Sequence, residues 1–488
     1  MRLINCPLKE NAINNSEQIA IISDRISITY GQLDNIVDAT IKKLKDIGVR
    51  KNDNICIVSP PSIEYIITLF ALWRIRAVAC LLSEQNTKSY INEQVKKIKA
   101  KLLLSGFSEI TSSQIICIKK IQLSDVVDIN IHHYKSGIEN NFNGYPSSQR
   151  STIMFTSGSS ADSKAVLHTY GNHYYNAKGS NENIPVRIGD RWFLSLPLYH
   201  VSGLSILFRC LIGGATIVLS EDRSNLHNLI DRFNITHISL VATQLFKILS
   251  DKKTSSKFKK LKAMLLGGSA FPEKLLHSAI NAELPVYLSY GLTEMASQVA
   301  TSALLSKTSD LSRVKVLPYR RVKIADDGEI LLSGKTLFKG YLSEGKIQNG
   351  TDSEGWFHSK DTGQIANRRF LTVKGRKDNM FISGGENIFP EEIEYYLHKL
   401  ESLENAIVIP VPDDKYGFRP IAFVKPARDV HLSRKVLFEH LTKYLPKFKI
   451  PDNFYLWPNK IQIDGIKISR RKFIEFAETG RLVSKLIE

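Results

Sequence analysis

Short apolar runs alternate with amphipathic stretches through the first half of the chain, and this alternation limits the fold more than any other feature. Residues 27–30 and 54–58 have the composition of strands, while apolar residues recur at helical spacing over 31–47. A helix over 63–73 and a strand over 77–82 continue the succession. Repeated strand, helix and strand predict α/β units around a parallel sheet.

The same pattern returns in the middle of the chain and then gives way to a different one. Four further apolar runs are each followed closely by turn residues, at 191–196, 215–219, 237–240 and 263–266. Open α/β sheets place their ligand-binding loops at such strand ends. From Val322 onward, short strands with turn signals predominate.

The last part of the chain has the pattern of a small α+β unit. We expect helices over 390–400 and 433–444, with Ser433 as an N-cap, and a strand over 406–411. We place the main boundary close to Asp378. The predicted fold class is α/β, with a large N-terminal domain of mixed and parallel sheets with helices, 1–377, and a small α+β C-terminal domain, 378–488.

Charge and composition exclude several classes of protein. The 488 residues include 66 Lys+Arg and 48 Asp+Glu, a formal net charge of +18, and 43% are hydrophobic. This is the composition of an ordinary globular protein, not of a collagen-like, disordered or disulfide-scaffold chain. The positive charge favours anionic partners. No aromatic-interleaved basic stripe or zinc-finger spacing supports nucleic-acid binding, so we expect no nucleic-acid partner.

Cysteine usage and hydropathy predict a cytoplasmic protein. The five cysteines are widely spaced and form no C-x-x-C, as expected of thiols in a reducing compartment. The first residues, MRLINCPLKENAINN, lack the apolar core of a signal peptide. The longest apolar stretch, 65–82, is interrupted by Arg74 and Arg76, so we expect no membrane span.

The sharpest local motif is the segment 155–164, Phe-Thr-Ser-Gly-Ser-Ser-Ala-Asp-Ser-Lys. An apolar run leads into hydroxyls, a glycine and one lysine, which together suit a polyphosphate. It is not a P-loop, because no second glycine precedes Lys164. Taken alone, such a loop is more often a surface turn.

Four further blocks give the motif a context. In 290–294, Tyr-Gly-Leu-Thr-Glu, a threonine hydroxyl beside a carboxylate suits Mg²⁺ bound to phosphates. In 355–361, Asp361 follows a turn and suits a pair of ribose hydroxyls. The segment 375–387 carries Gly-Arg-Lys-Asp and then Ser-Gly-Gly-Glu-Asn, and 465–470 places a lysine after a glycine.

These blocks, in this order, resemble the adenylate-forming superfamily of acyl-CoA synthetases, peptide-synthetase adenylation domains and luciferases, from about Ile28 to Ile468. The resemblance implies a mobile C-terminal domain and the following site residues: catalytic Lys467, Thr293 and Glu294, with Glu294 also as metal ligand; ATP-binding Thr156, Ser157, Gly158, Ser159, Ser160, Lys164, Gly268, Ser269, Ala270, Ser289, Tyr290, Gly291, Asp361 and Arg376; the hinge Asp378; and, on the CoA side, Ser383, Gly384 and Gly385.

Within that superfamily the chain is most similar to the 2-succinylbenzoate–CoA ligases of menaquinone synthesis. The residues that carry this similarity include 195–203, 265–270, 375–379 and 465–470. The similarity implies an AMP-forming acid–thiol ligase that needs Mg²⁺, with ATP and CoA as co-substrates. Its partners would be small molecules, including an aromatic dicarboxylic acid. The oligomeric state is left open, with a homodimer as one candidate.

Recognition of such an acid needs a cation, because only one of its two carboxylates is activated. Arg209 can form a fork to a planar carboxylate and lies in the otherwise apolar run 204–212. An idle arginine is uncommon in such a run. His200 and Ser202 are near in sequence and complete the predicted substrate-binding set, with His200 as a wall and not a base.

Some positions depart from the superfamily pattern, and three alternatives stay open. Ser160, Ala161 and Ser163 replace the usual Thr, Gly and Pro of the phosphate loop, and 312–319 lacks two customary glycines. These changes bear on rate more than on reaction type. The alternatives are another aryl- or acyl-CoA synthetase, an adenylating domain that loads a carrier protein, and a non-catalytic binding protein.

Overall fold

The computed structural model describes most of the chain, and every structural statement below concerns the residues that it describes. These residues are 3–107, 118–129, 142, 144–156, 163–222, 225–250, 256–268, 271, 273–307, 309–383, 386–413, 416–428, 430, 432–458, 461 and 469–478. Several predicted site residues lie outside them, and we name each of those where the site is described.

The first large sheet of the described residues has eight strands in the order β21-β20-β10-β9-β5-β4-β6-β7. It is parallel from β9 to β7, as the strand–helix–strand pattern predicts, and antiparallel from β9 to β21. Its strands are β4 (Asn54–Val58), β5 (Val78–Leu82), β6 (Leu102–Ser105), β7 (Lys119–Gln122), β9 (Arg150–Phe155), β10 (Ala165–Thr169), β20 (Gly340–Ser343) and β21 (Lys346–Gln348).

The second large sheet has thirteen described strands in the order β18-β19-β22-β23-β17-β16-β15-β14-β13-β11-β12-β2-β3. The strands from β2 to β15 run parallel and the others antiparallel. The bounds are β2 (Ile19–Ile22), β3 (Ser27–Thr29), β11 (Arg191–Phe193), β12 (Thr216–Val218), β13 (His237–Leu240), β14 (Ala263–Leu266), β15 (Val286–Leu292), β16 (Ser297–Thr301), β17 (Arg313–Val316), β18 (Arg320–Ile324), β19 (Glu329–Gly334), β22 (Phe357–Ala366) and β23 (Phe370–Arg376). Strands β1 (Leu3–Ile4) and β8 (Tyr145–Pro146) form a separate pair.

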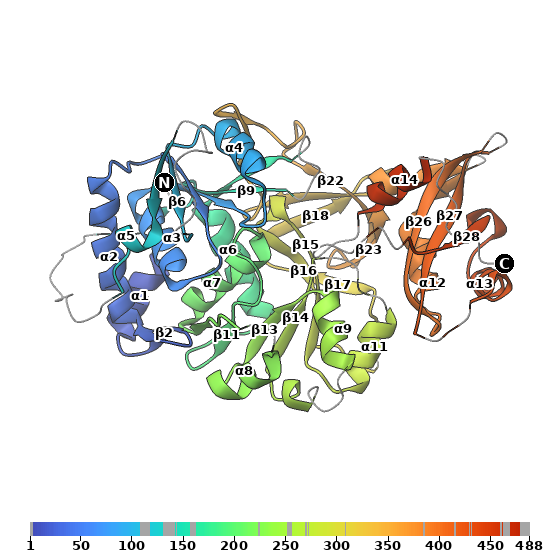
Figure 1. Ribbon diagram of the computed structural model, residues 1–488, viewed down its shortest axis with the longest axis horizontal. Coiled ribbons are helices and arrows are strands. Elements are labelled where there is room, and N and C mark those ends of the chain that lie inside the picture. Colours follow the sequence, from blue (N-terminus) through green and yellow to red (C-terminus); the bar gives the residue numbers. More distant parts are fainter. Residues whose placement is uncertain are drawn as a thin grey trace.

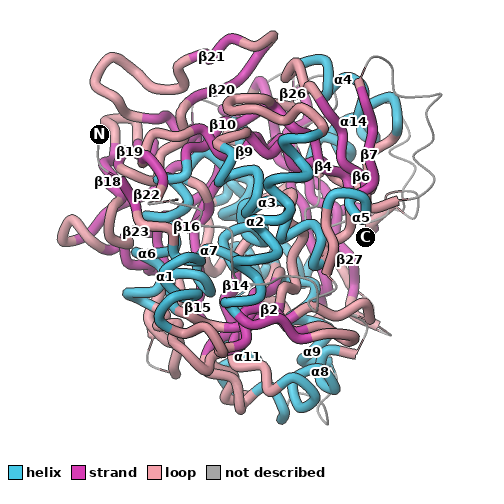
Figure 2. Tube along the Cα trace, turned by 90° about the vertical axis from the view of Figure 1, so that its left-hand side faces the viewer, coloured by secondary structure: helices cyan, strands magenta, loops and turns pink. Residues whose placement is uncertain are grey.

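Four helices contribute much of the main apolar core. Helices α2 (Tyr30–Asp46), α3 (Ile63–Ile75), α6 (Tyr170–Asn183) and α7 (Val201–Gly213) all contribute buried side chains to one cluster. Figure 2 shows α2, α3 and α7 near the centre of the molecule. The other helices that precede the C-terminal lobe are α1 (Pro7–Asn14), α4 (Lys88–Lys97), α5 (Leu123–Val126), α8 (Leu226–Phe233), α9 (Ala242–Ser250) and α11 (Glu273–Asn281).

The longest apolar stretch is divided between helix α3 and the buried strand β5. All but one of the thirteen residues of α3 are buried. The Arg74 guanidinium, which interrupts the stretch, is itself buried and pairs with the carboxylates of Asp34 and Asp38 on α2. Such a pair ties the two helices together, since removing one partner leaves a buried charge uncompensated. In the described part of the chain, no helix combines the length and hydrophobicity that crossing a bilayer requires.

The C-terminal elements have apolar clusters of their own, which include residues of α12, β26, β27, α13 and α14. Figure 1 shows them in orange and red, to one side of the two large sheets. Their bounds are β24 (Phe381–Ser383), β25 (Glu386–Ile388), α12 (Pro390–Leu397), β26 (Leu403–Asp413), β27 (Gly417–Pro426), α13 (Arg434–Thr442), β28 (Asn453–Leu456) and α14 (Arg470–Glu478). The Glu273 carboxylate of α11 contacts this lobe, because it accepts a hydrogen bond from Tyr395 and pairs with Lys399 at 3.2 Å.

The structure confirms the α/β fold class and most predicted elements. Strands 54–58, 237–240 and 263–266 have the predicted bounds, and Ser433 caps α13 by accepting from Val436 N. The strand after Pro285 runs from Val286 to Leu292, because its last residues pair with β16. Strand β16, which residues 293–296 join to β15, was not among the predicted elements.

Buried neutral histidines make stability depend on pH. Burial lowers the pKa of His168 to about 4 and that of His237 to about 4, from an unfolded value near 6.5. The unfolded chain therefore binds protons that the folded chain does not, and stability falls as pH drops from about 6.5 towards 4. We expect each of these histidines to cost about 1.4 kcal/mol per pH unit in that window.

Comparison with a His237→Leu variant isolates one of these titrations. Urea unfolding at pH 6.5 and 5.5 should show a smaller loss of stability in the variant than in the natural chain. Titrations that both proteins share cancel in this difference, including that of Glu394, whose pKa burial raises to about 7. An equal loss in both proteins would contradict the assignment of His237 as neutral and buried.

Candidate functional site

The base of the predicted phosphate loop is a hairpin between β9 and β10. Thr156 N donates to Lys164 O at 3.0 Å, and Lys164 N donates to the Thr156 hydroxyl at 3.2 Å. The Ser163 hydroxyl, at a position where the superfamily usually has proline, donates to Thr156 O at 3.2 Å. Lys97 of α4 donates to Ser163 O. These bonds close the loop at its neck, while Ser157, Gly158, Ser159 and Ser160 lie outside the described residues.

The predicted phosphate lysine and metal carboxylate meet at one tyrosine. Tyr341 of β20 donates its hydroxyl proton to Glu294 Oε1 at 2.8 Å. Its ring lies 4.8 Å from the Lys164 ammonium, measured to the ring centroid. Burial and the Glu294 charge both raise the pKa of Tyr341, so its hydroxyl stays a donor. Glu294 follows Thr293 in the 3-10 turn Thr293–Met295, directly after β15.

A second cluster joins the predicted ribose-binding residues. The Tyr290 hydroxyl donates to Asp361 Oδ2 at 2.6 Å, and Arg376 Nη1 lies 3.2 Å from Asp361 Oδ1. Burial, reinforced by the Asp361 charge, raises the pKa of Tyr290 well above its usual value. Burial alone would lower the pKa of Arg376, but the carboxylates of Asp361 and Asp378 outweigh it and raise that pKa. Residues from β15, β22 and β23 thus converge on one carboxylate.

The predicted hinge residue is connected to this cluster. Asp378 lies in the 3-10 turn Lys377–Asn379 and is half-exposed. Its carboxylate pairs with Arg376 at 3.3 Å and with the Lys360 ammonium at 3.2 Å. Arg376 therefore bridges Asp361 and Asp378 through its two terminal nitrogens. Asp378 thus lies between the predicted ribose-binding residues and the C-terminal elements.

The residues predicted on the adenine side lie at the ends of β14 and β15. Ser289 donates its hydroxyl proton to Leu266 O at 3.0 Å, which joins the two strands. Gly268 follows β14 with a φ of 92°, in the region that favours glycine. A Cβ on Gly291 would lie 2.2 Å from Ser297 O, so only glycine fits there. Ser269 and Ala270 lie outside the described residues.

Arg209 on α7 is a buried cation, 1% exposed. Its Nη2 donates to Gln298 Oε1 at 2.6 Å, and its guanidinium carbon lies 5.1 Å from the Trp192 ring centroid. Its Nε is buried with no hydrogen-bond partner in the described part of the chain, and no carboxylate of those residues lies within salt-bridge distance. Burial lowers its pKa to about 10, which leaves it charged at neutral pH.

A second buried arginine nearby has different hydrogen-bond partners. Arg320 donates to the main-chain carbonyls of Gln298, Pro318 and Asn176 at 2.6 to 3.0 Å. Its guanidinium is therefore used to hold the backbone together. Arg209 makes a single side-chain hydrogen bond to a neutral amide and remains the better candidate for an incoming anion.

His200 and Ser202 lie at the start of the helix that carries Arg209. His200 is the N-cap residue of α7, and its ring centroid lies 4.6 Å from that of Tyr199. Ser202 precedes Arg209 by two helical turns, so the two share a face of α7. Both His200 and Ser202 are partly exposed, unlike Arg209.

The remaining predicted residues belong to the C-terminal elements. Ser383 ends β24 and is buried, and its hydroxyl accepts from Arg419 Nη1 at 3.3 Å. Gly384, Gly385 and Lys467 lie outside the described residues. Sequence reasoning missed Tyr341 and Gln298, which touch the predicted residues through side-chain contacts only. No local motif marks either of them.

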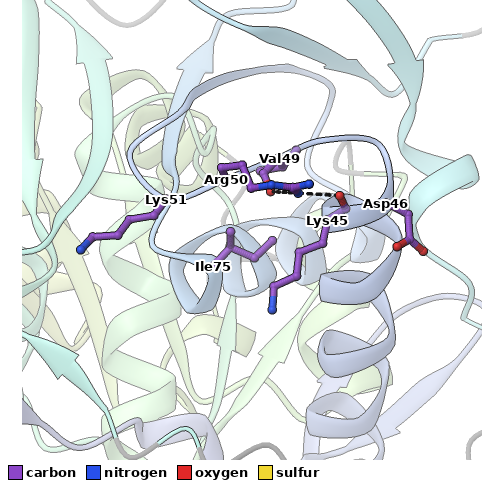
Figure 3. Close-up of a pocket in the computed structure, with 6 residues that line it drawn as sticks. All are labelled: Lys45, Asp46, Val49, Arg50, Lys51 and Ile75. Carbon is purple, nitrogen blue, oxygen red and sulfur yellow. Dashed lines mark hydrogen bonds between the residues drawn. The ribbon is translucent and has the colours of Figure 1, made fainter.

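The pocket in Figure 3 lies apart from all of these residues. It has a volume of about 340 Å³ and is lined by Lys45, Asp46, Val49, Arg50, Lys51 and Ile75. Arg50 Nη1 donates to the carbonyls of Lys45 and Val49 at 2.6 and 3.0 Å, at the C-terminal end of α2. Its guanidinium thus caps a helix end, and no predicted site residue lines this pocket.

Comparison with known proteins identifies the family. The model for AMP-binding enzymes matches residues 8–342, and that for the AMP-binding enzyme C-terminal domain matches 392–462. The chain belongs to the AMP-binding enzyme family, as the sequence resemblance predicted.

The chain is similar over its length to named members of this family. A 2-succinylbenzoate–CoA ligase from Oceanobacillus iheyensis is 32% identical over 452 residues, which are 89% of this chain and 91% of that protein. The o-succinylbenzoate CoA synthetase of Bacillus subtilis, solved with ATP and a magnesium ion, aligns with a TM-score of 0.84 at 28% identity, covering 96% and 99% of the two chains. The same enzyme with the acyl-adenylate intermediate OSB-AMP aligns at 0.83 and 28% identity, covering 97% and 98%.

Proposed function

We propose that this chain ligates 2-succinylbenzoate to CoA through an acyl-adenylate, consuming ATP and releasing AMP and pyrophosphate, as a step of menaquinone biosynthesis. The observation that carries the proposal is the meeting of Lys164 and Glu294 at Tyr341. It places one cation and one carboxylate beside the neck of the phosphate loop. The names and ligands of the similar proteins support 2-succinylbenzoate as the acid and an acyl-adenylate as the intermediate.

The nucleotide would be held by two of the clusters described above. In this proposal the phosphate-loop residues and Lys164 bind the phosphates, and Asp361 with Arg376 binds the ribose hydroxyls. Tyr290 lies against the adenine while its hydroxyl orients Asp361. Gly268, Ser289 and Gly291 would line the adenine side, at the ends of β14 and β15.

Magnesium fits the donor set of this site. Among the residues that the structure describes, no group of three or more His, Cys, Asp or Glu side chains could hold a metal ion alone. Mg²⁺ is commonly bound by one or two carboxylates together with substrate phosphates. Glu294 beside Thr293 matches that pattern. When bound, Mg²⁺ supplies charge neutralisation of the phosphates.

The chemistry has two displacement steps. A carboxylate oxygen of the acid forms a bond to the α-phosphorus of ATP, and the bond to the departing pyrophosphate breaks. The CoA sulfur then bonds to the acyl carbon, the carbon–oxygen bond to AMP breaks, and the thiol proton is lost. Positioning and charge stabilisation are the main demands of the first step. Lys467 would meet them by bridging the attacking carboxylate and the α-phosphate.

Arg209 would bind the carboxylate of the acid that is not activated. Its buried guanidinium has an unpartnered Nε and no countercharge among the described residues. A substrate carboxylate would supply both a hydrogen-bond acceptor and the missing charge. Gln298 holds the guanidinium from the other side without neutralising it. Ser202 and His200 would line the path towards the start of α7.

The two steps would use the C-terminal elements in turn. We take 1–377 as the domain that binds ATP and the acid, and 378–488 as a mobile domain with Asp378 as its hinge. Rotation about Asp378 would exchange Lys467 for the segment Ser383–Gly385, which faces CoA in this proposal. Such an exchange keeps water from the adenylate between the steps.

Replacement of Asp361 with asparagine should weaken ATP binding by about ten- to a hundredfold, since hydrogen bonds to a charged group contribute about 1.5–3 kcal/mol. Calorimetry with Mg-ATP measures the change in Kd. Asp327→Asn is the control, because Asp327 is half-exposed and pairs with Lys377. An Asp361→Asn variant that binds Mg-ATP as the natural chain does would exclude Asp361 from the ribose site.

The identity of the acid and that of the thiol acceptor are tested together by measuring AMP release in the presence of ATP and Mg²⁺. The acids are 2-succinylbenzoate, benzoate, a medium-chain fatty acid and acetate, each with and without CoA. We expect AMP release that requires CoA and strongly prefers 2-succinylbenzoate. Preference for another acid would keep the mechanism and reject the pathway. No turnover with free CoA, but turnover with a carrier protein, would favour the carrier-loading alternative.

Oligomeric state and location complete the proposal. We propose a homodimer as one candidate assembly, and we infer a cytoplasmic location, in keeping with free buried thiols at Cys6, Cys56, Cys80 and Cys210. Light scattering tests the first part, with an expected mass of twice 55.1 kDa. A monomeric mass would reject the dimer and leave the reaction unaffected.

A further inference from the structure

The turn that carries Thr293 and Glu294 is held by three different segments of the chain. The carbonyl oxygens of Thr293, Glu294 and Met295 accept from His168 Nε2 at 2.7 Å, Phe338 N at 2.8 Å and Asn176 Nδ2 at 2.9 Å, in that order. The turn is followed by Ala296 and Ser297 with φ of 56° and 122°, which L-residues rarely adopt. Such a backbone persists only where its surroundings fix it.

The histidine among these three donors is completely buried. His168 is 0% exposed, and its partner Thr152 is also 0% exposed. Because a carbonyl can only accept, the Nε2 of His168 must carry the ring proton. Its Nδ1 lies 3.5 Å from the Thr152 hydroxyl, which in turn lies 2.7 Å from His173 Nε2. The ring is therefore held on both edges, and its tautomer is determined.

His168 also belongs to a closed ring of contacts around the candidate site. It lies four residues after Lys164 along one extended segment, so the two side chains project from the same face, about 13 Å apart along the strand. Lys164 contacts the Tyr341 ring, Tyr341 donates to Glu294, and His168 donates to Thr293. Strand β10 thus fixes the spacing between the phosphate lysine and the turn.

We propose that His168 is a positioning residue, which through the Thr293 carbonyl orients the Thr293 hydroxyl and the Glu294 carboxylate towards the metal–nucleotide complex. The inference rests on the proposed function, since it assigns those two residues to Mg-ATP. His168 itself touches neither nucleotide nor metal in this account. Its contribution is the orientation of the turn, and it should be larger for ATP with metal than for ATP without.

Two variants of His168 separate its hydrogen bond from its bulk. His168→Leu removes the donor, and His168→Gln keeps an N–H that can reach the same carbonyl. Calorimetry on folded protein should show the Kd of Mg-ATP raised about tenfold in His168→Leu, the effect of one buried hydrogen bond. The Kd of ATP in EDTA should change by less than about twofold, and His168→Gln should restore most of the Mg-ATP affinity. His237→Leu, which removes another buried imidazole, should leave both values unchanged.

Several outcomes would overturn the inference. A folded His168→Leu variant with natural Mg-ATP affinity would do so, as would equal weakening with and without metal. Nitrogen-15 NMR of the natural chain gives a test that needs no variant: a neutral Nε2–H ring is expected for His168, and an Nδ1–H ring would contradict it. If the natural chain does not bind Mg-ATP at all, the proposed function fails with it.

Discussion

Replacing Lys467 with alanine is expected to lower the rate of acyl-adenylate formation by about 10²–10³-fold, the usual cost of losing one charge-stabilising donor. Formation of the thioester from supplied acyl-adenylate and CoA should stay within a few fold of the natural rate. We expect this difference because the proposed mechanism has Lys467 contact the reacting groups in the first step only. Pyrophosphate release and thioester formation, measured separately, give the two rates.

A nearby lysine provides the control for this experiment. Lys472 is an exposed residue of α14 in the same C-terminal region, and Lys472→Ala should change neither half-reaction. Equal loss of both half-reactions in Lys467→Ala would reject the alternating use of the C-terminal domain. Loss of neither would remove Lys467 from the site.

Replacing Arg209 with methionine is expected to lower kcat/KM for 2-succinylbenzoate by about 10²–10³-fold without destabilising the protein. Truncating one partner of a buried charge pair costs about 2–5 kcal/mol. In the free protein, however, Arg209 has no countercharge among the described residues, so an apolar side chain of similar length should be neutral or stabilising. Steady-state kinetics and urea unfolding measure the two quantities.

Arg320→Met is the matched variant, because Arg320 is also buried and lies on the other side of Gln298. Its loss would remove a donor from the carbonyls of Gln298, Pro318 and Asn176. We therefore expect a stability loss of about 2–5 kcal/mol, with the acid preference retained in the protein that remains folded. If Arg209→Met lost stability and kept its preference for 2-succinylbenzoate, the substrate role of Arg209 would be wrong.

Much of the fold could be predicted from the sequence because its parallel strands are buried on both faces. Apolar runs such as 54–58 and 263–266 stand out from their neighbours, and their bounds agree with the structure. The antiparallel part of the second sheet was harder to predict from the sequence. The extension of β15 to Leu292 depends on pairing with β16, and no apolar run marked β16 as a strand in the sequence.

The site was predictable where its residues form local motifs. Asp361 and Arg376 face each other on the paired strands β22 and β23, and the structure brings Tyr290, from a block much earlier in the sequence, to the same carboxylate. Tyr341 was missed, because a tyrosine in a short edge hairpin carries no motif. Arg209 was predicted from its apolar surroundings in the sequence. The structure separates it from Arg320, a second buried arginine, by what each guanidinium already contacts.

The central claim, activation of a carboxylate through an acyl-adenylate, is tested most directly by following an oxygen atom. The chain is incubated with ATP, Mg²⁺, CoA and 2-succinylbenzoate labelled with oxygen-18 in its carboxylates, and the products are separated by mass spectrometry. If a carboxylate oxygen attacks the α-phosphorus and leaves with AMP, each AMP formed carries one labelled oxygen. Unlabelled AMP, or label in inorganic phosphate with ADP as product, would contradict the account.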